Sequence, residues 1–176
     1  MKIELLASGF PVIDLQWMVR SHPELWNQYT ARTEDPASPH HGLDDIWLRF
    51  ADSGGRNVGG EEHESIWYRS SAVLEVKPVV SKIYDRFGGK KLGGVLMTRI
   101  PPGASVKPHQ DHGWHAREYE KIALQVESAP GQRFCFEDDE LETKPGDIFW
   151  FDNQYTHWVV NPTPYERVTL IICMKR

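Results

Sequence analysis

Residues 147–174 read DIFWFDNQYTHWVVNPTPYERVTLIICM, and this stretch decides the fold. Three short segments in it, residues 147–151, 157–161 and 167–174, are rich in the β-branched and aromatic residues that favour strands. Polar turn residues follow the first segment, and Pro162 and Pro164 separate the other two. The stretch therefore predicts short antiparallel strands joined by turns.

The same pattern extends back to about residue 93. Turns are expected at the Pro-Gly sequences of residues 101–103, 129–131 and 144–146. Between them we expect strands at residues 93–100, 105–109, 119–127, 132–137 and 140–143. About eight short strands suit a jelly roll, the two-sheet architecture shared with cupins. The expected fold class is mainly β with supporting helices, a double-stranded β-helix.

The first ninety residues have a different character. Apolar residues recur at helical spacing in residues 11–26 and again in residues 78–87, before a Gly-Gly pair. Residues 46–50 alternate as a strand, and the Gly-rich residues 52–62 predict a long mobile loop. We expect one domain, residues 1–176, in which residues 1–90 form helical and loop support and residues 91–176 form the jelly-roll core.

Composition narrows the class of protein. A hydrophobic fraction of 40% with 26% charged residues is typical of a soluble globular chain, and no apolar run is long enough for a membrane span. The net charge of −5 argues against a nucleic-acid partner, because such binding depends on many basic contacts with phosphates. The first residues lack a secretory pattern, so we expect a cytoplasmic location. Cys135 and Cys173 are expected to be buried free thiols.

Three polar residues predict a metal site. Alternation along an extended chain gives His109 and Asp111 the same direction, and His157 comes from a later strand. Two imidazoles and one carboxylate form the facial triad of non-haem Fe(II) oxygenases, which leaves three coordination positions open. We therefore expect His109, Asp111 and His157 to be both the metal ligands and the catalytic centre.

A carboxylate site is expected beside the metal. Arg167 follows His157 by ten residues, and a guanidinium there could bind the far carboxylate of 2-oxoglutarate through two hydrogen bonds. Thr169 shares a face with Arg167 and could add a hydroxyl. Lys121 and Arg99 lie in neighbouring strands and are further candidates for binding the co-substrate.

The chain resembles an Fe(II)- and 2-oxoglutarate-dependent dioxygenase, nearest to the aspartyl/asparaginyl β-hydroxylase-like branch. The resemblance covers roughly residues 94–176, through the Arg-Ile-Pro-Pro-Gly of residues 99–103, the His-x-Asp pair, residues 146–152, and the later His and Arg-x-Thr. It implies Fe(II), 2-oxoglutarate and O₂ as cofactors, and hydroxylation of a small-molecule, amino-acid or peptide substrate with release of succinate and CO₂. Members of that branch need not carry the acidic ligand, so Asp111 favours the wider dioxygenase pattern.

Other functions compete with this interpretation. A non-redox cupin, either an isomerase or a binding module, would account for His157 and Asn161 but gives Arg167 no task. A catalytically silent domain would not be expected to retain three ligands and the arginine. A nucleic-acid demethylase would need two closely spaced arginines after His157, and the sequence lacks them. The sequence leaves the oligomeric state open.

The remaining histidines are expected to lie in loops. His40, His41 and His63 fall outside the strand pattern and favour solvated positions. His112 and His115 lie close to the metal pair but do not alternate with a carboxylate on a strand. We therefore expect none of the five to bind the metal.

Overall fold

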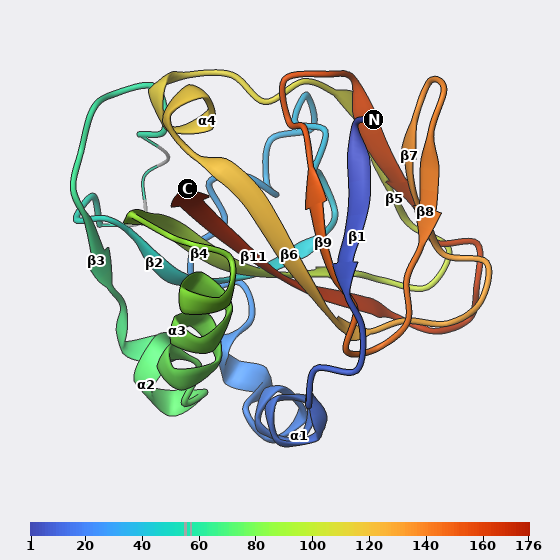
Figure 1. Cartoon of the computed structure of the whole chain (residues 1–176), viewed down its shortest axis with the longest axis horizontal. Helices are drawn as coiled ribbons and strands as arrows, with labels where there is room; N and C mark the ends of the chain where they lie inside the picture. Colours follow the sequence, from blue (N-terminus) through green and yellow to red (C-terminus); the bar gives the residue numbers. More distant parts are fainter. Residues whose placement is uncertain (55, 57) are drawn as a thin grey trace.

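Two antiparallel sheets form the frame of the computed structural model, which describes residues 1–54, 56 and 58–176 (Figure 1). The larger, seven-stranded sheet has, in spatial order, β1 (Ile3–Ala7), β9 (Ile148–Phe151), β6 (Glu120–Glu127), β11 (Arg167–Lys175), β4 (Lys91–Ile100), β2 (Asp44–Ala51) and β3 (Ser65–Trp67). The smaller, four-stranded sheet has β5 (Ser105–His109), β10 (His157–Val160), β7 (Arg133–Phe136) and β8 (Glu140–Glu142). This arrangement confirms the expected jelly-roll class.

Alternation along the central strands separates two faces of the larger sheet. On β11, Val168, Leu170, Ile172 and Met174 belong to a buried cluster shared with the helices. The intervening Arg167, Thr169, Ile171 and Cys173 line a cavity on the opposite face. A second buried cluster contains residues from both sheets, among them Phe134, Phe149 and Val159. One face of the larger sheet thus meets the helices, and the other meets the cavity and the smaller sheet.

Helices cover the face of the larger sheet that is turned away from the smaller one (Figure 1). These helices are α1 (Ile13–Ser21), α2 (Arg69–Val73) and α3 (Lys77–Arg86). A 3₁₀ turn, η1 (Pro23–Leu25), follows α1, and a short helix, α4 (Trp114–Glu118), follows β5 in the sequence. The expected helix at residues 11–26 is interrupted at His22, whose ψ of 59° is not helical. The cause is Pro23, because a proline disfavours helical backbone in the residue before it.

The expected strands from residue 93 onward all occur, within about two residues of their predicted ends. The expected helical and loop character of residues 1–90 is only partly right, because β1 and β3 also lie in the larger sheet. β1 pairs with β9, and β3 pairs with β2. The mobile loop expected at residues 52–62 includes Gly55 and Asn57, which lie outside the described residues.

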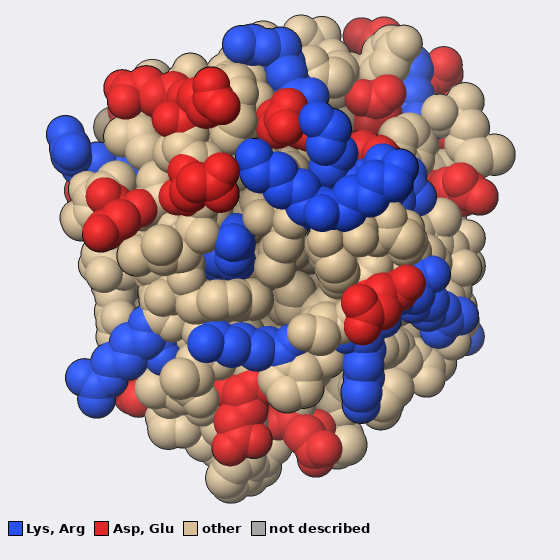
Figure 2. All heavy atoms as spheres, turned by 60° about the vertical axis from the view of Figure 1, so that its left-hand side comes forward, with Lys and Arg blue, Asp and Glu red and all other residues tan. Residues whose placement is uncertain are grey.

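The outer surface carries charges of both signs. On the face shown in Figure 2, Lys and Arg side chains are bordered by Asp and Glu side chains. None of the helices in the described part of the chain has the length and apolar character needed to cross a membrane. Cys135 and Cys173 are buried free thiols, as expected.

Candidate active site

A cavity of about 480 Å³ lies on the face of the larger sheet that meets the smaller one. It follows β11 from Arg167 to Cys173, a length of about 20 Å at about 3.3 Å per residue. Its polar lining includes His109, Asp111 and His157, and much of the rest is apolar. A concave, largely apolar space with a few polar groups is typical of a small-molecule site.

The predicted metal residues meet where β5 ends and β10 begins. His109 is the last residue of β5, and it pairs in register with His157, the first residue of β10. Asp111 lies beyond the end of β5, so the expected strand alternation does not apply to it. Instead its backbone N–H donates to the carbonyl of Asn153 at 3.0 Å. This bond brings Oδ1 of Asp111 to 3.4 Å from Nε2 of His109.

Backbone carbonyls fix the orientation of both imidazoles. Nδ1 of His109 lies 2.8 Å from the carbonyl oxygen of Lys107, and Nδ1 of His157 lies 2.9 Å from that of Tyr155. A carbonyl only accepts, so each Nδ1 carries the proton and each Nε2 keeps its lone pair. Metal-binding histidines commonly hold this tautomer through such a hydrogen bond. Burial lowers the pKa of His157, which favours the neutral ring.

Asp111 is held as a carboxylate. Burial alone would raise its pKa, but the Lys121 ammonium opposes burial, and the pKa is held well below its ordinary value. Nζ of Lys121 lies 3.3 Å from Oδ2 of Asp111. A deprotonated carboxylate beside two neutral imidazoles is a donor set suited to a divalent transition metal.

Arg167 is buried at the far end of the cavity. Its side chain is 1% exposed, and Nη1 and Nη2 have no hydrogen-bond partner among the described residues. Burial lowers the pKa of Arg167 to about 10. Thr169, two residues along β11, also lines the cavity. Its Oγ1 donates a hydrogen bond to Oε1 of Gln125 at 3.5 Å. Two unpaired guanidinium nitrogens in a cavity indicate that this end receives an anion.

The expectation for Arg99 is corrected by the structure. Thr98 and Ile100 line the cavity, and alternation along β4 therefore turns Arg99 to the opposite face. There its Nη2 lies 2.8 Å from Oδ2 of Asp44, and its guanidinium lies 4.3 Å from the centre of the Trp26 ring. Arg99 does not reach the cavity.

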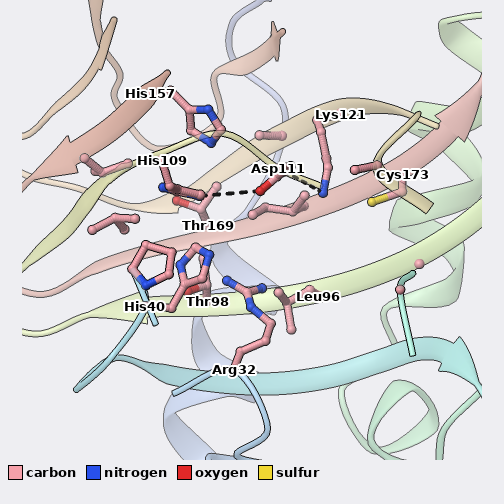
Figure 3. A pocket seen from close by; sticks show the side chains of 18 of the residues that line it. Arg32, His40, Leu96, Thr98, His109, Asp111, Lys121, His157, Thr169 and Cys173 are labelled. Carbon is pink, nitrogen blue, oxygen red and sulfur yellow. Dashed lines mark ion pairs between the residues drawn. The ribbon is translucent and has the colours of Figure 1, made fainter. Parts of the chain in front are cut away.

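Lys121 lines the cavity but lies away from Arg167. It pairs across strands with Cys173, six residues along β11 from Arg167. Figure 3 shows its side chain directed at Asp111, between that residue and Cys173. The structure therefore places Lys121 beside Asp111, and not beside Arg167, where the sequence had suggested a role in binding the co-substrate.

Two histidines that were expected in loops lie at the cavity, His40 half-buried and His115 buried. His40 lies on the loop of residues 30–43, with its ring centre 4.8 Å from that of His109 on β5. Burial lowers the pKa of His40 well below its ordinary value. His115 on α4 accepts a hydrogen bond from the Gly94 N–H at 3.0 Å, and burial lowers its pKa to about 3. No sequence signal marked either one, because both depend on packing between distant segments.

The residues present fit an iron ion and 2-oxoglutarate. Nε2 of His109 is buried without a hydrogen-bond partner in the described part of the chain, as are both Nη atoms of Arg167. Such buried polar atoms are rare unless a ligand, ion or water completes them. The His109 nitrogen suits a metal ion, and the two Arg167 nitrogens suit a carboxylate. The fit therefore agrees with the cofactors that the sequence resemblance implied.

Comparison with solved structures finds the same fold in known oxygenases. A viral collagen prolyl hydroxylase from Paramecium Bursaria Chlorella virus-1, determined as its 2OG complex, has 10% identity and a TM-score of 0.57, covering 98% of this chain and 95% of that one. A Pseudomonas putida prolyl-4-hydroxylase has 16% identity and a TM-score of 0.56, covering 99% and 92%. A 2OG-Fe(II) oxygenase family oxidoreductase from Burkholderia pseudomallei has 14% identity and a TM-score of 0.55, covering 98% and 94%. No curated protein sequence matches the chain.

The match to a family is more specific than the shared fold. Residues 26–176 match the model of the aspartyl/asparaginyl beta-hydroxylase family, which is most of the chain. The match confirms the branch that the sequence resembled, and with it the expected enzyme class, an Fe(II)- and 2-oxoglutarate-dependent dioxygenase. The chain belongs to the aspartyl/asparaginyl β-hydroxylase family.

Proposed function

We propose that this enzyme hydroxylates a small molecule, an amino acid or a peptide side chain, using Fe(II), 2-oxoglutarate and O₂ and releasing succinate and CO₂. The observation that carries the proposal is Arg167. It is a fully buried cation with two nitrogens that have no partner among the described residues, in the same cavity as His109 and Asp111. A dianionic co-substrate that also contacts a metal accounts for both features.

Each polar residue has a role in this proposal. His109, Asp111 and His157 would hold the iron, and Arg167 with Thr169 would bind the far carboxylate of 2-oxoglutarate. When bound, the iron and the co-substrate supply the oxygen activation that attacks a substrate C–H bond. Lys121 keeps Asp111 charged through its contact at 3.3 Å, so that the carboxylate remains a ligand.

The apolar lining protects the reaction and strengthens carboxylate binding. Val106, Phe134 and Val159 line the cavity and belong to the buried cluster between the sheets. Burial there keeps water from competing for the Arg167 nitrogens, and an ion pair is stronger where water is excluded. The same lining limits the access of water to the reacting centre.

The size of the cavity and the solved relatives support the substrate class. A volume of about 480 Å³ lies within the range of small-molecule sites. Two of the similar solved structures are prolyl hydroxylases, which supports an amino-acid or peptide substrate. Residues at the Cys173 end of the cavity, including Arg32, Leu96 and Lys121, surround the space left for it (Figure 3).

A succinate-release assay tests the proposal. The protein would be incubated with Fe(II), 2-oxoglutarate and O₂ across pools of amino acids, peptides and metabolites, with an iron-free control and an Arg167→Ala control. The proposal predicts iron-dependent succinate that rises with at least one pool and falls in the variant. Absence of iron-dependent succinate from every pool and from the protein alone would contradict it, and would favour a binding or non-redox role.

A further inference from the structure

His40 is a further side chain of a metal-ligating type in the lining of the active-site cavity. It lies on the loop of residues 30–43, more than sixty positions before His109 in the sequence, yet it lines the same cavity. Its ring meets that of His109 edge to face, with the ring planes at 81°. Its Nδ1 is buried and has no hydrogen-bond partner within the described chain. An unpaired buried imidazole nitrogen beside a metal ligand indicates a missing partner.

The donor atoms of His40, His109 and Asp111 are close enough to share one ion. One ligand atom from each lies within 4.8 Å of the other two. His157 is not part of this compact group, although its ring centre is only 4.4 Å from that of His109. Figure 3 shows His157 on one side of the His109–Asp111 pair and His40 on the other. The pair is therefore flanked by two imidazoles.

Backbone hydrogen bonds hold His40 in this place. The N–H of Lys107 on β5 donates to the carbonyl of Pro39 at 3.0 Å, which ties the loop to the strand that carries His109. The N–H of His40 donates to Oγ of Ser38 at 3.1 Å, and the N–H of Gly42 donates to the carbonyl of Thr33 at 3.2 Å. The position of His40 is thus coupled to that of His109 through the backbone.

We propose that His40 binds the metal ion when 2-oxoglutarate is absent, and that the co-substrate displaces it. The inference rests on the proposed function, because it concerns the same metal pair. A facial triad leaves three positions open, and a keto acid that chelates the ion needs two of them. His40 would fill one of the two positions that the keto acid takes, so that the resting metal has four protein ligands until the co-substrate arrives.

Competition for one position has two measurable consequences. Removing His40 weakens metal binding in the absence of 2-oxoglutarate, because one ligand is lost. It also strengthens 2-oxoglutarate binding to the metal-loaded protein, because the co-substrate no longer has to displace an imidazole. A residue that only packs beside His109 would not move the two affinities in opposite directions.

The experiment uses Co(II), whose visible spectrum reports its ligands. Co(II) would be titrated into the full chain, His40→Ala, His40→Phe and His41→Ala without 2-oxoglutarate, followed by calorimetry and absorption. 2-Oxoglutarate would then be titrated into each Co(II)-loaded protein. His41 is the matched control, because it is an exposed histidine in the same loop. His40→Phe retains a ring against His109. A loss of Co(II) affinity in both His40 variants is therefore due to the missing imidazole nitrogens and not to lost packing.

The expected result is a loss of Co(II) affinity of at least about tenfold in both His40 variants, a changed Co(II) spectrum, and tighter 2-oxoglutarate binding. His41→Ala should match the unchanged chain. Unchanged Co(II) affinity and spectrum in both His40 variants would overturn the inference, as would 2-oxoglutarate binding that weakens together with metal binding. If the unchanged chain bound neither Co(II) nor 2-oxoglutarate, the proposed function itself would fail, and the two failures are therefore distinguishable.

Discussion

Replacing Arg167 by methionine should stabilise the ligand-free fold while removing co-substrate binding. The guanidinium is 1% exposed and its Nη atoms are unpaired within the described residues. Burial lowers its pKa to about 10, and at about 1.4 kcal/mol per pH unit this corresponds to a penalty of about 3 kcal/mol for keeping the charge in the fold. Methionine has a similar length and no charge, so its apolar side chain should suit the surrounding cluster.

Arg167→Met should change stability and co-substrate affinity in opposite directions. The free energy of unfolding should rise by about 1 to 3 kcal/mol, the range found when buried charges are replaced by apolar residues. The affinity for 2-oxoglutarate should fall by about 2 to 5 kcal/mol, or from about 30-fold to about 5000-fold, because one partner of a buried charge pair is lost.

Two assays and one control test this prediction. Chemical denaturation without ligand measures the free energy of unfolding, and calorimetric titration of the metal-loaded protein measures 2-oxoglutarate affinity. Arg133→Met is the control, because Arg133 pairs with Glu140 on the exposed side of β7 and should change either property by less than about 1 kcal/mol. An Arg167→Met protein that is less stable and binds 2-oxoglutarate normally would refute the reasoning, since the arginine would then be structural.

Three further predictions concern the site and its frame. His157→Ala and Asp111→Ala should each abolish or strongly reduce Fe(II) binding while circular dichroism shows a retained fold, and normal binding would remove that residue from the ligand set. Arg99→Ala should leave the 2-oxoglutarate requirement unchanged and lower stability by less than about 1 kcal/mol, because its pair with Asp44 is partly exposed; a raised requirement would contradict its placement. Gly93→Ala should lower the free energy of unfolding by about 1 to 3 kcal/mol, because a Cβ there would lie 2.8 Å from the buried Tyr119 ring. Gly60→Ala is the control in the same denaturation experiment, and it should be nearly neutral because the space around a Cβ at that position is open.

The local sequence pattern was sufficient to predict the strands after residue 93 and which side chains of β11 share a face. Alternation in residues 167–174 separates Arg167 and Thr169 from the apolar residues that meet the helices, and the structure keeps that separation. The same rule applied to β4 would have excluded Arg99, since Thr98 and Ile100 are the residues that face the cavity. The error came from considering charge and proximity in sequence without the direction of the side chain.

Long-range packing set the limits of the sequence prediction. His40 and His115 have no local pattern that distinguishes them from solvated loop histidines, yet both line the cavity, His40 half-buried and His115 buried. β1 was missed because Ile3–Ala7 is short and becomes a strand through its pairing with β9. Asp111 reaches His109 through the carbonyl of Asn153, which is a contact that no spacing rule contains.

The location of the protein and the class of its substrate stay predictions. The cytoplasmic location and the absence of a nucleic-acid partner rest on composition and charge. The assignment of residues 1–176 to one domain is likewise a proposal. It is supported by the mixing of β1, β2 and β3 with later strands in one sheet.

Anaerobic titration of Fe(II) and 2-oxoglutarate into the protein tests the central claim most directly. A keto acid that chelates the iron held by this site should produce a visible metal-to-ligand charge-transfer band. The band should appear in the unchanged chain, weaken in Arg167→Met at limiting 2-oxoglutarate, and vanish in Asp111→Ala. No band at saturating Fe(II) and 2-oxoglutarate, in a protein that binds both, would contradict the account.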